Sequence, residues 1–215
     1  MKSAVEKTRM GIMGGTFDPV HFGHLVAAEG ARHHFHLDKV VFVPAARPPH
    51  KGLEDVSNPR HRLNMTILAT RSNPHFEVSD VEIRRTGPSY TVDTVSHFRR
   101  LWPDSVIYFI TGADAVLEIL TWHRVDQLLD MCFFIAATRP GYRLENLSGS
   151  LKGLPERCMA KISVMEVPAL AISSTDIRQR VRKGMPIKYL LPEEVEEYIY
   201  SNNLYKEKPS GGAGS

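Results

Sequence analysis

Apolar and polar residues follow two periods along this chain, and the two periods alternate from one segment to the next. Apolar runs predict strands at 9–15, 39–45, 105–112, 131–138 and 161–167, and the period-two alternation of 75–85 predicts another. Apolar positions at helical spacing predict helices at 23–35, 60–72, 90–102, 174–184 and 192–203. Strands and helices that alternate in this way predict an α/β fold: a doubly wound, mainly parallel sheet with helices on both faces.

The length of the chain suits one domain, because 215 residues bury a sizeable core and are few for two domains. There is no internal repeat and no Gly/Ser-rich linker before the last residues. We therefore expect a single domain over 1–205, with a helical C-terminal part from about 168. Residues 206–215, KEKPSGGAGS, have the composition of a flexible tail.

Composition and charge indicate a globular domain and argue against a nucleic-acid partner. The apolar share of 42% and the charged share of 24% are typical of a globular domain. The formal charge of +3 is mildly basic, and the basic residues of 60–71 and 176–184 mix with apolar ones at helical spacing. We expect most of them on solvated helix faces, and no nucleic-acid partner.

Localisation is predicted from what the sequence lacks. The two cysteines form no CxxC motif, which fits a reducing compartment. The first residues do not resemble a signal peptide, and no apolar run approaches the roughly 20 residues that span a bilayer. We expect a soluble, cytoplasmic protein without membrane contact; the sequence leaves its oligomeric state open.

A doubly wound sheet binds ligands at the carboxyl ends of its strands, near the point where the strand order reverses. Four unusual segments follow predicted strands. They are GGTFDPVHFGH at 14–24, PAARPPHK at 44–51, TGADA at 111–115 and PALAISSTDIR at 168–178. We expect the functional residues there.

The first of these segments has the outline of a phosphate site. Gly14 and Gly15 end the predicted strand, where missing side chains let a ligand approach the backbone. The next helix presents free N–H groups and a partial positive charge, and His21 and His24 lie on one side of its first turn. The spacing alone leaves three interpretations open: a structural feature, a phosphate site, or half of a metal site. Neither GxxxxGK[ST] nor GxGxxG is present.

Two of the segments carry a family resemblance. GGTFDPVHFGH resembles the first signature of the nucleotidyltransferase superfamily with the T/HxGH motif, and ISSTDIR resembles its second signature, ISSTxxR. Together with PPHK, PSYTVDT, TGADA and TWH, they resemble the bacterial nicotinate-nucleotide adenylyltransferase family over about 10–204. The resemblance implies a Rossmann-like nucleotidyltransferase fold. It also implies the reaction of ATP with nicotinate mononucleotide, which gives nicotinate adenine dinucleotide and pyrophosphate in NAD biosynthesis.

The resemblance also implies roles for individual residues on the ATP side. His21 and His24 would contact the ATP phosphates, and Arg178 would reach the leaving phosphates. The ATP-binding set would be Gly14, Gly15, Thr16, Phe17, Gly112, Asp114, Ile172, Ser173, Ser174 and Thr175. By themselves, SSTD is an ordinary helix N-cap and Asp114 an ordinary residue of a first helical turn. Mg²⁺ would accompany ATP, held by phosphates and water, with no metal site on the protein.

The implied acceptor site holds the mononucleotide. Its residues would be Lys51, Thr91, Trp122, His123 and Arg139. Trp122 would stack on the pyridine ring, while Thr91 and backbone N–H groups near Thr91 and His123 would hold the carboxylate. The family often has Tyr where this chain has His123, a change that a backbone contact survives. A lone Trp is more often a core residue, and a loop Lys is more often solvated.

Four alternatives remain at this point. A phosphopantetheine adenylyltransferase shares both end signatures, and a related enzyme could use nicotinamide mononucleotide. A nucleotide-binding regulator without catalysis would keep the loops and release no pyrophosphate. A metal-dependent hydrolase would use His21 and His24 as ligands.

Overall fold

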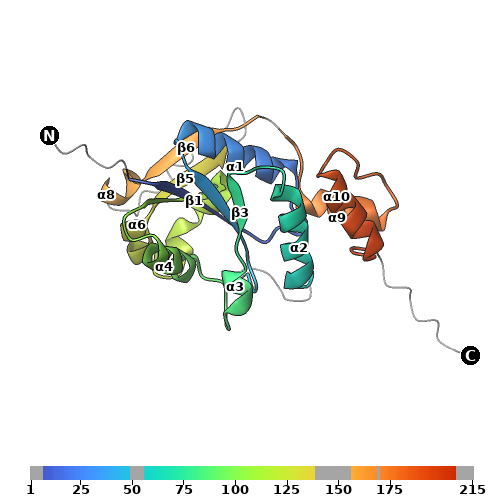
Figure 1. Cartoon of the computed structure of the whole chain (residues 1–215), viewed down its shortest axis with the longest axis horizontal. Helices are drawn as coiled ribbons and strands as arrows, with labels where there is room; N and C mark the ends of the chain where they lie inside the picture. The colour runs from blue at the N-terminus through green and yellow to red at the C-terminus, as the bar shows by residue number, and fades with distance from the viewer. Residues whose placement is uncertain (1–6, 49–55, 139–155, 169, 207–215) are drawn as a thin grey trace, which may run out of the picture.

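The structure, a computed structural model, describes residues 7–48, 56–138, 156–168 and 170–206. Its described strands form one parallel sheet in the order β3-β2-β1-β4-β5-β6 (Figure 1). The strands are β1 Arg9–Gly15, β2 Lys39–Pro44, β3 Phe76–Val78, β4 Val106–Gly112, β5 Phe133–Thr138 and β6 Ile162–Glu166. The predicted doubly wound parallel sheet is confirmed.

The helices connect the strands and follow them at the C-terminus. They are α1 Phe22–His34, α2 Pro59–Thr70, α3 Val81–Arg84, α4 Thr91–Leu101, α5 Ala113–Leu117, α6 Val125–Met131, α8 Glu156–Met159, α9 Ser174–Arg182 and α10 Glu193–Ser201, with a 3-10 turn, η2, at Ile119–Thr121. None of the helices within the described ranges is long and apolar enough to cross a membrane.

The strand order reverses between β1 and β4. From β1 the chain builds outward through β2 and β3, and it then returns to the other side of β1 with β4. Both neighbours pair with β1 in parallel, so Gly11 lies between Val40 of β2 and Tyr108 of β4. The carboxyl ends of β1 and β4 therefore flank the crevice where such sheets bind ligands.

Alternate residues of the central strands enter two separate cores. Ile12 and Phe109 belong to the core beneath α4 and α6, whereas Met13 and Ile110 belong to the core beneath α1 and α2. Figure 1 shows these two helix pairs on opposite sides of the sheet. Burial on both faces explains why the central strands are continuously apolar, as in the predicted strand at 39–45.

One predicted strand was wrong over most of its length. Of the alternating stretch 75–85, only Phe76–Val78 pairs with β2, and Val81–Arg84 is helical. Pairing of this edge strand ends at Val78, opposite Phe42, although β2 continues to Pro44. The Ser79 hydroxyl oxygen then accepts the Val81 N–H at 3.4 Å, which favours a turn. The other predicted boundaries agree with the structure within two residues.

Aromatic rings fill the space beside the first two glycines of the 14–24 segment. A Cβ on Gly14 would lie 2.7 Å from Cζ of Phe109, and one on Gly15 would lie 2.7 Å from Cε1 of Phe17. Gly112, at the end of β4, has open space at the same position. The first two glycines are thus required by the chain's own packing.

Gly14→Ala is expected to lower the free energy of unfolding by about 1–3 kcal/mol, because the new methyl group overpacks against the Phe109 ring. Gly112→Ala is the matched control and should change stability by less than about 0.5 kcal/mol. Urea denaturation of both variants measures the difference. Equal stabilities would contradict the packing argument.

Candidate active site

A first cavity of about 230 Å³ lies at the carboxyl ends of β1, β4 and β5. Four residues predicted for the ATP side meet in it: His21, His24, Gly112 and Ile172. The rest of its lining is Met13, Gly23, Ala27, Thr111, Ala137, Thr138, Val167, Pro168 and Leu170. Residues about 150 positions apart in sequence thus line one crevice at the ends of β1 and β4, where the strand order reverses.

The two histidines form one unit at the start of α1. His21 is the N-cap, 6% exposed, and its backbone N–H donates to Nδ1 of His24 at 3.2 Å. The ring centroids are 3.8 Å apart, and Phe17 sets its ring edge-on to His24 at 5.1 Å. Because Nδ1 of His24 accepts, this hydrogen-bond network assigns the ring proton to Nε2, which is then a donor.

The N-terminus of α1 adds a positive potential to this unit. Its first turn holds no acidic residue, so nothing there offsets the partial charge of its N–H groups. A ring N–H and a helix N-terminus at one cavity suit an anion such as a phosphate.

The second signature segment packs directly onto the first. The Ser174 hydroxyl donates to the Pro19 carbonyl at 2.9 Å, and Nη1 of Arg178 donates to the Asp18 carbonyl at 2.8 Å. Ser173 caps α9, because its hydroxyl oxygen accepts the Asp176 N–H at 3.1 Å. The two segments are therefore neighbours, as the resemblance implied.

Asp18 holds this junction together through contacts that the sequence analysis did not predict. Its carboxylate is 3% exposed and accepts the Ser57 N–H at 3.0 Å and the Tyr205 hydroxyl at 2.7 Å. Burial raises the pKa of Tyr205, and the Asp18 charge adds to the effect, so the phenol stays protonated and donates. No local motif marks Tyr205, which follows the last helix by a few residues.

Arg62 is an exception to the expectation that most basic residues of 60–71 lie on a solvated helix face. It is fully buried and donates to the carbonyls of Thr16 at 2.7 Å, Ser57 at 2.9 Å and Ala46 at 3.3 Å. Burial lowers its pKa, and Asp18 opposes that shift. One guanidinium thus joins the segments after β1 and β2 to the start of α2.

A second cavity of about 450 Å³ lies between the start of α4 and the end of η2. It brings together three residues predicted for the mononucleotide: Thr91, Trp122 and His123. Its other lining residues are Ser89, Tyr90, Ala115, Glu118 and Thr121. The site prediction had left out Tyr90 although its motif, PSYTVDT, was part of the resemblance, and Glu118 carried no signal.

The aromatic residues of this cavity have different surroundings. His123 stacks on Tyr90 with ring centroids 4.3 Å apart. Trp122 is half-buried and meets Phe109 and Phe134 edge-on, each at 6.0 Å. The indole therefore closes the core beneath it and also lines the cavity.

A buried polar cluster connects the second cavity to the segment after β2. The Ser89 hydroxyl oxygen accepts the N–H groups of Ala46 at 2.9 Å and Arg47 at 3.1 Å. Behind it, Thr94 donates to the buried Glu82 carboxylate at 2.5 Å. Burial raises the pKa of Glu82, and the hydroxyl donors oppose that shift. This cluster holds the path of the 44–48 segment beside the cavity.

Several predicted residues lie elsewhere. Asp114 is exposed in the first turn of α5 and lines neither cavity, while Lys51 and Arg139 lie outside the described residues. Neither cavity is lined by the predicted residues Gly14, Gly15, Thr16, Phe17, Ser173, Ser174, Thr175 and Arg178. Within the described ranges, no group of three or more His, Cys, Asp and Glu is placed to hold a metal ion.

The fold and the two signature segments define a nucleotidyltransferase. The sequence model of the cytidylyltransferase-like family matches residues 12–180, and the chain belongs to that family. A probable nicotinate-nucleotide adenylyltransferase from Moorella thermoacetica is 61% identical over 204 residues, which cover 94% of each chain. One from Thermoanaerobacter sp. is 56% identical over 205 residues, 95% of this chain and 97% of the relative. Within the larger family, the chain belongs to the nicotinate-nucleotide adenylyltransferases.

A solved structure agrees with the fold. The nicotinic acid mononucleotide adenylyltransferase of Plasmodium falciparum, complexed with NaAD, superposes with a TM-score of 0.76 at 22% identity. The match covers 92% of this chain and 97% of the other. At this identity the likeness establishes the arrangement of strands and helices.

Tyr205→Phe is expected to lower the free energy of unfolding by roughly 1.5–3 kcal/mol, because the buried Asp18 carboxylate loses one of its donors. Tyr200→Phe is the matched control, since Tyr200 is 41% exposed and should tolerate the change. Thermal and chemical denaturation of both variants give the comparison. A Tyr205→Phe protein as stable as Tyr200→Phe would refute the role of the phenol.

Proposed function

We propose that this chain transfers the adenylyl group of ATP to nicotinate mononucleotide, giving nicotinate adenine dinucleotide and pyrophosphate in NAD biosynthesis. The observation that carries the proposal is the junction of the His21–His24 unit with α9 and Arg178 beside the reversal of strand order. Membership in the nicotinate-nucleotide adenylyltransferase family supports the choice of acceptor.

The reaction is an in-line displacement in which the 5′-phosphate of the mononucleotide attacks the α-phosphorus of ATP. An oxygen–phosphorus bond forms to the mononucleotide, and the bond to the leaving pyrophosphate breaks. The attacking oxygen is already ionised at neutral pH, so the site needs alignment and charge stabilisation rather than a strong base.

His24 supplies charge stabilisation in this proposal. Its Nε2–H, fixed by the bond from the His21 backbone to Nδ1, donates to an oxygen of the reacting α-phosphate. His21 and the N-terminus of α1 bind the phosphates beside it. Arg178 stands one turn into α9, held on the Asp18 carbonyl, with its charge available to the leaving phosphates. Of the remaining ATP-side residues, Gly112 and Ile172 line the same crevice, and the others are proposed on the resemblance alone.

The second cavity is the proposed mononucleotide site. The Trp122 indole offers a face for the pyridine ring, and the start of α4 at Thr91 presents N–H groups to the carboxylate. Glu118 repels that carboxylate from the opposite part of the lining, which favours the α4 end. Lys51 and Arg139 are proposed for the phosphate and the substrate pocket on the resemblance alone.

A divalent metal, Mg²⁺ in this proposal, accompanies the nucleotide and neutralises part of its phosphate charge. Because the described residues offer no cluster of metal ligands, ATP phosphates and water would hold it.

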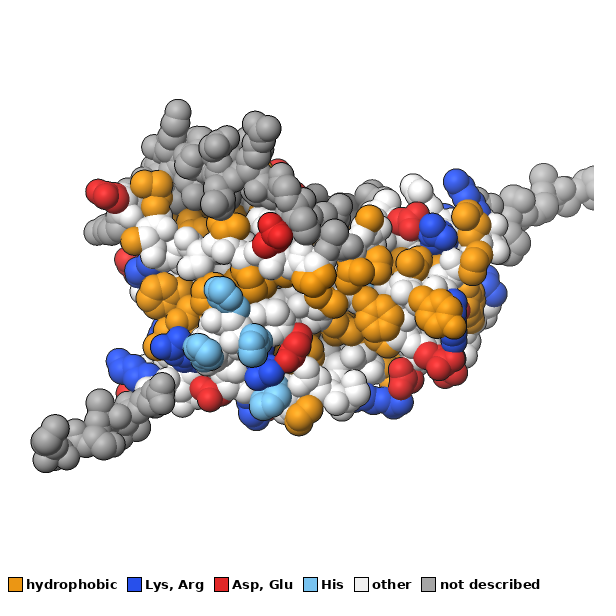
Figure 2. All heavy atoms as spheres, turned by 90° about the horizontal axis from the view of Figure 1, so that it is seen from above, with side chains coloured by type: hydrophobic (Ala, Val, Ile, Leu, Met, Phe, Trp, Pro, Cys, Tyr) orange, Lys and Arg blue, Asp and Glu red, His pale blue; other side chains and the backbone are white. Residues whose placement is uncertain are grey.

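On the face in Figure 2, basic and acidic side chains are interspersed, and a band of apolar side chains separates some of them. On this face, that pattern supports small-molecule substrates rather than nucleic acid. A cytoplasmic location is proposed separately, from the reducing compartment that fits the two cysteines.

Pyrophosphate release tests the function. ATP is supplied with nicotinate mononucleotide, nicotinamide mononucleotide or phosphopantetheine in separate reactions. Strong preference for the acid is expected, because a neutral amide cannot use a carboxylate site. Preference for another acceptor would overturn the acceptor assignment. ATP binding without pyrophosphate release would favour a non-catalytic regulator, and a stoichiometric transition metal would favour a hydrolase.

His24→Ala is expected to reduce kcat by roughly 100- to 1,000-fold without unfolding the protein, because one preorganised donor to the reacting phosphate is lost. His33→Ala is the control, since His33 is exposed near the other end of the same helix. The pyrophosphate assay and a thermal melt are run on both. Near-normal turnover of His24→Ala would remove His24 from the mechanism.

Trp122→Ala should weaken nicotinate mononucleotide binding roughly 10- to 100-fold and leave ATP binding nearly unchanged, because only the pyridine ring loses its stacking surface. Trp102→Ala serves as the control, since Trp102 packs on Phe98 at the far end of α4. Separate calorimetric titrations of the two substrates distinguish the effects. Equal weakening of both ligands would indicate a general structural defect instead.

A further inference from the structure

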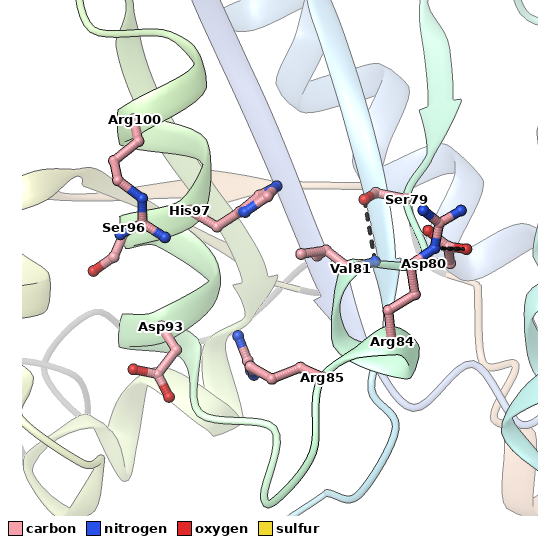
Figure 3. A pocket seen from close by; sticks show the side chains of 9 residues that line it. All are labelled: Ser79, Asp80, Val81, Arg84, Arg85, Asp93, Ser96, His97 and Arg100. Atoms are coloured by element: carbon pink, nitrogen blue, oxygen red, sulfur yellow. Dashed lines mark hydrogen bonds and ion pairs between the residues drawn. The ribbon is translucent and has the colours of Figure 1, made fainter.

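A third cavity, of about 830 Å³, lies between α3 and α4, and nothing in adenylyl transfer uses it (Figure 3). Its lining is Ser79, Asp80, Val81, Arg84, Arg85, Asp93, Ser96, His97 and Arg100. None of these residues lines either cavity of the proposed active site. We call it the α3–α4 groove.

One face of α4 forms a wall of this groove. This wall begins with Asp93 and continues with the residues three, four and seven positions after it, which are Ser96, His97 and Arg100. Residues with this spacing lie on one side of a helix. Figure 3 shows His97 reaching from α4 toward α3, and Arg85 reaching back from the end of α3 toward α4. Both side chains belong to half-buried residues. Two cationic or potentially cationic groups thus converge on the gap.

The charges of the groove do not cancel. Nε of Arg84 pairs with Asp80 at 2.7 Å, which neutralises the α3 side of the opening. The described residues make no ion pair with Arg85 or Arg100, and Asp93 is the remaining carboxylate of the lining. Among the lining residues, three guanidinium groups stand with two carboxylates before His97 is counted. The buried carboxyl group of Glu82, on α3, also interacts with Arg85, but burial raises its pKa and so opposes its negative charge.

The positive charges of the groove affect the pKa of His97. Burial lowers the pKa of its imidazole, and the guanidinium groups of Arg100 and Arg85 lower it further. The other charged groups of the lining are Arg84, Arg85 and Asp80 from the α3 side and Asp93 and Arg100 from its own helix. A bound anion would offset the two arginines and favour the protonated ring, which can then donate from both nitrogens.

We propose that the α3–α4 groove binds the phosphate group of a small organic phosphate through Arg85, His97 and Arg100. Guanidinium and imidazolium groups give charge-assisted hydrogen bonds to phosphate oxygens. The volume of about 830 Å³ exceeds the needs of a phosphate and leaves room for the organic part. Asp93 lies on the same wall and can hydrogen-bond its hydroxyl groups. This inference does not depend on the activity of the enzyme.

The test follows the His97 ring by NMR in the intact protein, with inorganic phosphate as the probe. The chain has ten histidines, and His97→Gln identifies the resonance by its loss. The His97 pKa is expected to rise in a saturable way as phosphate is added. Potassium chloride at equal ionic strength is the reference, because simple screening of the arginines also raises this pKa without saturation.

Substitutions locate the effect in the groove. Arg85→Gln and Arg100→Gln should each weaken the phosphate response of His97 roughly tenfold or more, since each removes a charged donor. Arg182→Gln, at an exposed position of α9, should leave the response unchanged. A pKa that does not move, that moves equally with chloride, or that moves equally in all three variants would overturn the proposal.

Discussion

The buried carboxyl group of Asp18 is the constraint on which the proposed active site depends. Its carboxylate accepts the Ser57 N–H and the Tyr205 hydroxyl, and its carbonyl accepts Arg178. A buried carboxylate without donors is costly, so the segments that carry Ser57 and Tyr205 are both needed beside it, and Arg178 adds a bond to the backbone of the same residue. The loop that carries the two histidines is thus held by parts of the chain up to 187 residues away.

Phe109 couples the two cavities in a similar way through packing. Its ring occupies the space left by Gly14, beside the histidine loop, and meets Trp122 of the second cavity edge-on at 6.0 Å. The proposed nucleotide and mononucleotide sites therefore rest on the two sides of one core residue of β4. Packing this close transmits small displacements, which makes the relative position of the two sites a property of the core. Direct transfer between two bound substrates requires that kind of fixed geometry.

Much of the fold was predictable because local pattern and global structure agree. Central strands such as Lys39–Pro44 are apolar after their first residue, and helices such as α4 and α10 carry apolar faces of the right period. The failure at 75–85 has a physical origin, since alternation does not reveal whether a partner strand continues alongside. On the site side, His21, His24 and Trp122 stand in local motifs. Arg62 and Tyr205 do not, and their roles arise only from distant carbonyl and carboxylate partners.

The sequence by itself determined the α/β class, the segments that follow the strands, and the residue types at the proposed phosphate and pyridine sites. These features depend on near neighbours, on period and on motifs, which a linear chain contains. Only the tertiary structure decided that Gly14 accommodates a ring, that Arg62 is buried, that His24 carries its proton on Nε2, and that Arg85 and His97 face one groove. Each of those depends on a contact or a charge whose partner is set by packing in three dimensions, and short-range residue patterns do not encode it.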